Sequence, residues 1–220
     1  MKLVLASGSQ RRRELLTMCG YDYEIIVSNA DETIDENDPE SFVRALSFRK
    51  AKEVFDRLFA AGRRDFAVIG SDTVVAFQKD GETKPVIIGK PKDAEDAVRI
   101  LSMLSGKTHR VFTGVSVIAD IPDENAAAQC SIREKEEIQT ECSITEVTFE
   151  TLSPDEITDY VNSGDPLDKA GSYGIQGPFG MFVREIRGNY FTVIGMPIPV
   201  LYKMLKKIGI LPHGFYERIE

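Results

Sequence analysis

The sequence predicts an α/β protein, because apolar stretches typical of strands alternate with stretches that carry helix start and stop signals. The clearest strand is residues 67–77, an apolar, β-branched run of the kind that is buried on both faces of a sheet. The clearest helix starts at residues 153–156, where a serine cap, a proline and a glutamate three residues after the cap follow the standard order. A chain of 220 residues is long enough for one large domain or two closely joined lobes.

The other elements follow from the same signals. Strands are expected at residues 2–6, 23–27, 67–77, 86–88, 108–119 and 144–152, and then in a hairpin formed by residues 181–183 and 191–195. Helices are expected from Ser7 or Ser9 to Gly20, from Asp38 to Gly62, from Asp93 to Leu104, from Ser153 to Gly164 and from Pro197 to Ile208. These expected strands and helices therefore cover most of the chain.

Two segments and the C-terminus lie outside this pattern. Residues 120–141 are polar and charged, which predicts an extended hairpin loop. Residues 165–177 are too rich in glycine and charge for packed core, and functional residues favour such loops. We expect a single domain over residues 1–212 and a frayed tail over residues 213–220.

Composition excludes several classes of protein. The net charge of −8 argues against binding to a nucleic acid polymer, and no apolar run approaches the roughly 20 residues of a membrane span. The apolar run within residues 1–6 is too short for a signal peptide. Cys19, Cys130 and Cys142 are widely spaced and form no CxxC pair, which predicts a reducing, cytoplasmic compartment and no zinc site.

An anion-binding corner is expected where the first strand meets the first helix. Arg11, Arg12 and Arg13 stand in the first helical turn, where cations oppose the helix dipole and stability alone would favour Asp or Glu. Together with the small residues Ser7 to Ser9 and free backbone N–H groups, these arginines indicate an anion site. Three consecutive helical residues cannot share a face, so at least one arginine is expected on the surface. The corner is not a Walker loop, whose GxxxxGK[ST] pattern is missing.

Asp72 is the one acidic residue in the central apolar strand. A carboxylate there is costly to desolvate unless a cation, a metal or hydrogen-bond donors meet it. A structural role at a strand end and a functional role are both open from the local sequence. Gly70 just before it indicates close backbone approach or a bulge.

Two lysines are candidates for the same anion. Lys50 lies on the apolar stripe of its helix, where it either extends to water or faces a cleft that holds an anion. Lys90 follows Gly89 just before a helix, a combination that indicates a phosphate contact.

Two further candidates have mainly structural interpretations. Residues 31–36 are acidic, which favours a solvated loop over a supply of oxygen ligands for Mg²⁺. His109 is expected to be structural rather than a base, because no Ser or Cys nucleophile pattern accompanies it.

Five stretches, taken together and in order, resemble the Maf family of nucleoside triphosphate pyrophosphatases, which is related to the inosine triphosphatase group. They are residues 5–12 (LASGSQRR), 70–75 (GSDTVV), 89–91 (GKP), 104–109 (LSGKTH) and 168–177 (DKAGSYGIQG). Gln10 stands where the family usually has proline, and Ser71 stands where alanine is commoner. Neither departure removes a reactive group.

The resemblance implies an α/β fold of two lobes around a twisted mixed β-sheet, with flanking helices and a central cleft. It implies hydrolysis between the α and β phosphates of a nucleoside triphosphate, giving the monophosphate and pyrophosphate. The branch that it implies acts on dTTP and UTP. It also implies a homodimer. A triphosphate brings about four negative charges, which the cations together with a divalent metal cofactor, Mg²⁺ or Mn²⁺, would offset.

The resemblance also implies roles for single residues. Asp72 matches the catalytic acidic residue, as the general base. From its chemistry the same carboxylate could also bind the metal, and Glu32 is the candidate for a second carboxylate on the metal. The residues implied in binding the phosphates are Ser7, Ser9, Arg11, Arg12, Lys50, Lys90 and, less firmly, Lys169. The positions implied in substrate specificity are Arg11, Thr73 and Gln176. A glutamine amide can both donate to and accept from a pyrimidine edge.

Two alternatives stay open at this point. One is a nucleotide-binding regulator of cell division that does not turn its ligand over. The other is a pyrophosphatase for a different base, such as 7-methyl-GTP, or for modified pyrimidine nucleotides that the cell discards.

Overall fold

The computed structural model describes residues 1–78, 81–121 and 135–214. Its strands are β1 Lys2–Leu5, β2 Glu24–Ile25, β3 Phe66–Phe77, β4 Val86–Ile88, β5 Thr108–Ile121, β6 Lys135–Phe149 and β7 Val183–Arg187. Its helices are α1 Gln10–Met18, α2 Pro39–Ala60, α3 Ala94–Leu104, α4 Pro154–Asn162, α5 Tyr190–Ile194 and α6 Ile198–Lys207. The predicted α/β class is confirmed.

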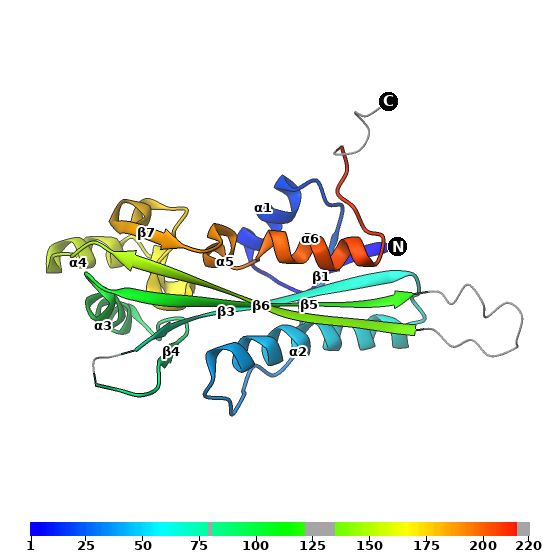
Figure 1. The fold of residues 1–220 in the computed structure, drawn as a ribbon, viewed down its shortest axis with the longest axis horizontal. Coiled ribbons are helices and arrows are strands. Elements are labelled where there is room, and N and C mark those ends of the chain that lie inside the picture. Colours follow the sequence, from blue (N-terminus) through cyan, green and yellow to red (C-terminus); the bar gives the residue numbers. More distant parts are fainter. Residues whose placement is uncertain (79–80, 122–134, 215–220) are drawn as a thin grey trace, which may run out of the picture.

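The strands form one mixed sheet in the order β2-β1-β3-β5-β6-β7, with β4 paired to β3 (Figure 1). β1 is parallel to both β2 and β3, and the remaining pairs are antiparallel. In Figure 1, α2 lies along one face of the long strands, while α1, α5 and α6 lie along the other. α3 and α4 lie at the end of the strands away from α6.

The apolar residues of β3 divide between these two layers because strand side chains alternate. Val68 belongs to the core beneath α2, whereas Ile69 belongs to the core beneath α1 and α6. A third core joins the far end of β3 to α3 and α4. No helix of the described residues has the length and apolar composition needed to cross a membrane.

A gap along one edge of β3 sets the position of the cavity described below. β1 pairs with residues 66–69 of that strand, and β4 pairs with residues 75–77. The opposite edge is paired continuously with β5 from Ala67 to Ala76. Residues 70–74 therefore have no strand partner on the first edge, within the described part of the chain. Side chains from both faces of β3 can reach this opening.

Two glycines let α2 lie directly on the sheet, as the sequence predicts for Gly70. A Cβ atom at Gly70 would lie 2.1 Å from the carbonyl oxygen of Ser47, and one at Gly114 would lie 2.2 Å from that of Val43. The Ser47 hydroxyl then reaches the hydroxyl of Ser116 on β5 at 3.0 Å. This close approach fixes how far the side chains of α2 extend toward β3.

The predicted hairpin over residues 181–195 is wrong in its second half. β7 pairs with β6, but residues 190–194 form the short helix α5. Asn189 caps this helix by accepting a hydrogen bond from the Phe191 amide at 2.8 Å, and Gly195 ends it at φ 115°. A short apolar run does not distinguish a strand from a helix, so the capping residues carry the signal.

The prediction that residues 165–177 lie outside the packed core is wrong for residues 171–174. Gly171, Ser172, Tyr173 and Gly174 are all buried. A Cβ at Gly171 would lie 2.5 Å from Val75 Cγ2, so the small residues allow the segment to pack against β3. Glycine serves close packing here as well as chain flexibility.

The expected loop over residues 120–141 is also too long. β5 continues to Ile121 and β6 begins at Lys135, so both ends of the stretch are strand. Polar residues occur in this part of β6 because β7 pairs only with residues 146–149. Residues 122–134, with Cys130, and the tail residues 215–220 lie outside the described residues.

The close approach of α2 predicts that Gly70→Ala destabilises the fold. The methyl group must displace the backbone of α2, and we expect the free energy of unfolding to fall by about 3 kcal/mol in urea denaturation. Gly89→Ala is the control, since a Cβ there meets no atom within 4 Å. A Gly70→Ala variant as stable as that control would contradict the close packing.

Candidate active site

A cavity of about 1090 Å³ lies at the gap in the sheet. Its walls come from the β1–α1 corner, α2, β3, the residues after β4, the segment 165–177 and the end of α5. It brings together every site residue nominated by the sequence, which are Ser7, Ser9, Arg11, Arg12, Glu32, Lys50, Asp72, Thr73, Lys90, Lys169 and Gln176. Residues far apart in the chain therefore share one site, while their individual roles stay predictions.

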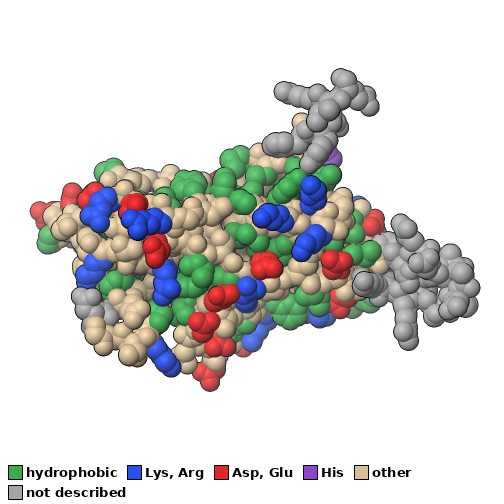
Figure 2. Space-filling model, viewed as in Figure 1, with side chains coloured by type: hydrophobic (Ala, Val, Ile, Leu, Met, Phe, Trp, Pro, Cys, Tyr) green, Lys and Arg blue, Asp and Glu red, His purple; other side chains and the backbone are tan. Residues whose placement is uncertain are grey.

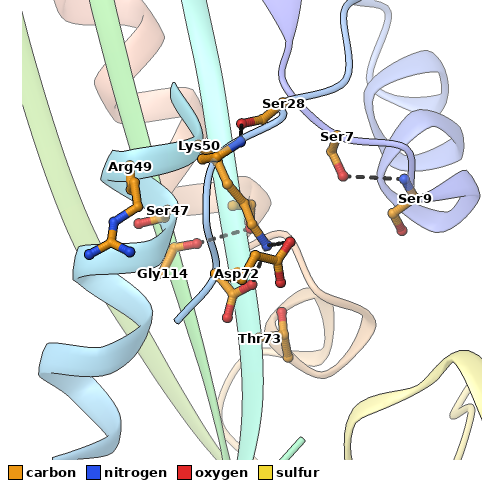
Figure 3. Close-up of polar contacts among 12 residues, drawn as sticks. Ser7, Ser9, Ser28, Ser47, Arg49, Lys50, Asp72, Thr73 and Gly114 are labelled. Atoms are coloured by element: carbon orange, nitrogen blue, oxygen red, sulfur yellow. Dashed lines mark hydrogen bonds and ion pairs between the residues drawn. The ribbon is translucent and has the colours of Figure 1, made fainter. Parts of the chain in front are cut away.

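Asp72 and Lys50 form a short ion pair in the cavity (Figure 3). Lys50 extends from α2 toward β3, and its Nζ lies 2.7 Å from Asp72 Oδ1. The same Nζ lies 3.0 Å from Glu32 Oε1, so one ammonium group joins two carboxylates. The side chains of Lys50 and Asp72 are each 12% exposed, whereas Glu32 is largely open to solvent. The costly charge in the central strand is thus met by a cation, as the sequence requires.

Arg12 is held differently, by neutral oxygen atoms. Its Nε donates to the carbonyl oxygen of Gly195 at 2.8 Å. One terminal nitrogen donates to Ser7 Oγ at 3.1 Å and the other to Thr73 Oγ1 at 3.4 Å. Burial lowers the pKa of this guanidinium, and the charge of nearby Asp72 opposes that effect.

The charge of Arg12 is therefore not neutralised by a salt bridge within the described residues. Three of the five N–H groups of a guanidinium are used in these bonds, which leaves two for a ligand. α1 also has no side-chain cap, so the N–H groups of its first turn add to the attraction for anions. Arg12 and this helix start therefore present hydrogen-bond donors and a positive charge that no carboxylate of the described residues neutralises.

Arg11 and Lys169 share one carboxylate. Arg11 reaches Asp168 Oδ2 at 3.2 Å, and Lys169 Nζ reaches Asp168 Oδ1 at 2.7 Å. Burial acts to raise the pKa of Asp168, but its bonds with Lys169 and Arg11 outweigh burial and lower it. Asp168 thus links α1 to the segment 165–177 across the cavity.

Lys169 also fixes the conformation of its own segment. Its Nζ bonds the carbonyl oxygen of Asp165 at 2.5 Å and Asp165 Oδ1 at 3.0 Å. The Tyr160 hydroxyl donates to Asp165 Oδ2 at 2.5 Å and accepts from the Gly174 amide at 3.0 Å. Burial raises the pKa of Tyr160, so its proton stays available for this bond. The network holds the backbone that leads to Gln176.

Lys90 and Gln176 are exposed at the rim of the cavity. Ser9 is half-buried, and its amide donates to Ser7 Oγ at 3.2 Å (Figure 3). Lys90 and Gln176 are thus open to solvent at the rim, while Ser9 is partly covered.

Cationic and acidic side chains balance in the cavity. The five cations are Arg11, Arg12, Lys50, Lys90 and Lys169, and the five carboxylates are Glu14, Glu32, Asp72, Asp165 and Asp168. On the face drawn in Figure 2, the coloured Lys and Arg residues are likewise interspersed with Asp and Glu. A polyanion therefore meets Arg12 and Lys90 without a carboxylate partner among the described residues, and it binds the other three cations only by displacing the carboxylates that they now contact.

Arg13 and His109, two residues weighed in the sequence analysis, do not line the cavity. Arg13 donates to the carbonyl oxygen of Gly8 at 3.1 Å, in agreement with one of the three arginines standing apart. His109 is 2% exposed and its Nε2 bonds the Tyr173 hydroxyl at 3.0 Å. Burial lowers the pKa of His109 to about 3, so it is neutral and structural, as expected.

Sequence reasoning assigned no role to three site residues that the structure brings forward. Asp165 and Asp168 lie in the charged, glycine-rich segment, and the alternation of charges there was the available signal. Gly195 contributes a carbonyl oxygen, which leaves no trace in a sequence. Ser71 Oγ lies 3.0 Å from that oxygen and 2.9 Å from the Gly114 carbonyl oxygen, so the serine found in place of the family's commoner alanine has acceptors for its one proton.

The geometry is that of a charged cavity, lined by five cations and five carboxylates and built at a gap along one edge of β3 in a mixed α/β sheet. A sequence profile described as Maf-like protein matches residues 2–208. The chain therefore belongs to the Maf family.

Several curated relatives are similar over nearly their whole length. A protein of Agathobacter rectalis named "dTTP/UTP pyrophosphatase" is 41% identical over 217 residues, which cover 95% of this chain and 98% of that protein. One of the same name from Bacillus thuringiensis subsp. konkukian is 42% identical over 210 residues, covering 95% and 96%. Among solved structures, the Ham1 protein of Staphylococcus aureus is similar with a TM-score of 0.48 and 16% identity, covering 94% of this chain and 100% of that one.

Proposed function

We propose that this protein hydrolyses dTTP and UTP between the α and β phosphates, releasing the monophosphate and pyrophosphate. The observation that carries the proposal is the set of cations gathered around Asp72 at the gap in the sheet, in a member of the Maf family. The names of relatives at 41–42% identity support the choice of substrates.

Binding of the triphosphate follows from the charges of the cavity. At neutral pH a nucleoside triphosphate carries about four negative charges, which is more than Arg12 and the start of α1 offset alone. Arg11, Lys50 and Lys169 join them when phosphate oxygens replace the carboxylates that they now contact. Lys90 lies at the rim, where it meets the chain of phosphates without losing a partner that the described residues supply.

Asp72 acts on the attacking water in this proposal. The water forms a bond to phosphorus, the bridging bond between the α and β phosphates breaks, and pyrophosphate leaves. Asp72 orients the water and accepts its proton, which is the role that general base catalysis assigns to a carboxylate. Lys50 holds the carboxylate in place at 2.7 Å until the substrate arrives.

A divalent cation, Mg²⁺ or Mn²⁺, fits the same centre. Asp72 and Glu32 converge on one point, since both contact Lys50 Nζ. The described residues contain no group of three or more metal-ligating side chains, and Mg²⁺ commonly takes only one or two carboxylates together with substrate phosphates. The ion would offset phosphate charge. Asp72, with Glu32 beside it, would hold it.

Gln176 is the proposed reader of the base. It is exposed at the rim, on the segment that Tyr160 and Lys169 hold in place. Its amide can donate to a carbonyl oxygen of uracil or thymine and accept from the ring N–H. Thr73 and Arg11 are the other proposed specificity positions.

A homodimer in the cytoplasm belongs to the same proposal. The dimer rests on the family resemblance, and the compartment rests also on the wide spacing of the cysteines.

Asp72→Asn tests the reaction and the base together. Pyrophosphate release with Mg²⁺ is measured from dTTP, UTP, CTP, GTP and 7-methyl-GTP. The unmodified protein is expected to prefer dTTP and UTP, and the variant to lose about 10²- to 10⁴-fold in kcat because the proton acceptor is gone. Binding without release from any substrate would instead favour the regulator of cell division. Full activity in the variant would contradict the role of Asp72.

Gln176→Glu tests the reading of the base. A carboxylate only accepts, so the hydrogen bond to the uracil carbonyl is lost. We expect the ratio of kcat/KM for UTP over GTP to fall by about tenfold. Gln78→Glu, at an exposed glutamine outside the cavity lining, is the charge-matched control. An unchanged ratio would remove Gln176 from the specificity site.

Asp168→Asn tests the exchange of ion pairs. Removing the carboxylate frees Arg11 and Lys169 in advance, so affinity for inorganic tripolyphosphate should rise about fivefold in calorimetry, as expected for an exposed ion pair. Asp159→Asn makes the same charge change at an exposed residue of α4, outside the cavity lining. Weaker binding in Asp168→Asn would mean that the carboxylate orients these cations instead of competing for them.

A further inference from the structure

A row of hydroxyl groups crosses the sheet beneath α5. Thr73 on β3 lies opposite Thr113 on β5, which lies opposite Ser143 on β6. We call these three residues the hydroxyl row. Thr73 lines the cavity, whereas Thr113 and Ser143 do not, and Thr113 has no exposed surface.

The direction of the hydrogen bonds in this row is fixed by Thr192. Thr113 Oγ1 lies 2.7 Å from the Thr192 carbonyl oxygen, which can only accept. A hydroxyl has a single proton, so Thr113 gives its own to α5 and must accept from Thr73 at 3.0 Å. Thr73, having donated, uses its lone pairs to accept from Arg12 at 3.4 Å. The chain therefore runs from Arg12 through Thr73 and Thr113 to α5.

The end of α5 also contacts Arg12 directly. Gly195, at the end of α5, accepts from Arg12 Nε at 2.8 Å. α5 has only five residues, and hydroxyl groups dock it on the sheet. Thr113 binds its Thr192 carbonyl, Ser143 binds the Thr192 hydroxyl at 2.7 Å, and Thr145 binds Asn189. Both routes from the guanidinium thus lead to Thr113, directly through Thr73 and indirectly through α5.

We propose that Thr113 is a positioning residue for phosphate binding, and that the hydroxyl row orients Arg12 with its two remaining N–H groups toward the polyphosphate. The proposal rests on the proposed function in taking a polyphosphate as the ligand of Arg12. Besides the specificity role proposed for it above, Thr73 then acts on the substrate through Arg12, and this contribution of the hydroxyl row is the same for all nucleotides, whatever their base.

The test is Thr113→Val, which keeps the shape of the side chain and removes the hydroxyl. Binding of inorganic tripolyphosphate is measured by calorimetry, and KM and kcat are measured for UTP and GTP. We expect affinity for tripolyphosphate to fall about tenfold and both KM values to rise by the same factor, since a bond to a charged group loses its support. Thr113→Ser should restore binding to within about twofold, and Ser143→Ala should give an intermediate loss.

Thr148→Val is the matched control. Thr148 is a buried threonine of β6, and its hydroxyl lies 2.8 Å from the hydroxyl of Thr108 on β5. It should change thermal stability as Thr113→Val does and leave tripolyphosphate binding intact. Equal binding by Thr113→Val and the unmodified protein, failure of Thr113→Ser to restore it, or an equal loss in Thr148→Val would overturn the inference.

The two proposals fail in different ways. A protein that binds tripolyphosphate through the hydroxyl row but releases no pyrophosphate from any nucleotide would refute the proposed function and support this inference. A change confined to the ratio of UTP to GTP would refute the inference and leave the proposed function intact. Absence of tripolyphosphate binding by the unmodified protein would overturn the inference as well.

Discussion

The open edge of β3 is the constraint on which the rest of the site depends. Because β1 ends its pairing at Ile69 and β4 begins at Val75, the strand between them presents side chains from both of its faces to one opening. Asp72 meets Lys50 from α2 on one face, and Thr73 meets Arg12 from α1 on the other. A continuous strand partner would close this opening and separate the two groups. Ligand sites at breaks in strand order follow the same principle in other α/β sheets.

The two sides of the opening are held by different means, and the difference has a chemical consequence. On the α2 side, glycine allows backbone contact, and an ion pair then fixes the side chains at short range. On the α1 side, neutral oxygen atoms orient Arg12 and leave its charge unpaired among the described residues. In the first arrangement the Asp72 carboxylate contacts the Lys50 ammonium group, to which an anionic ligand can bind in its place. The second holds a positive charge ready for an anion at all times.

Much of this arrangement could be predicted from the sequence. The buried strand with Asp72, the arginines in a first helical turn and Gly70 are local signals. The strand is buried, the arginines lie at the start of α1 and Gly70 allows α2 to approach closely, while the roles of Asp72 and the arginines stay predictions. The helix α5 could not be separated from a strand by its apolar pattern, because five residues are too few to show a period. Gly171 packs against Val75, which lies far away in the chain. Contacts through backbone oxygens, such as that of Gly195, carry no sequence signal at all.

The position of Thr73 shows why a residue's place in a motif does not settle its role. Thr73 follows Asp72 directly in the sequence, which suggests contact with the substrate. Its hydroxyl is nevertheless bonded to Thr113 and Arg12, since the row across the sheet fixes where its proton goes. What a hydroxyl does is decided by the acceptor that ends its chain of bonds, here the carbonyl of Thr192. The sheet register that aligns Thr73, Thr113 and Ser143 is therefore as much a part of the site as the residues that line the cavity.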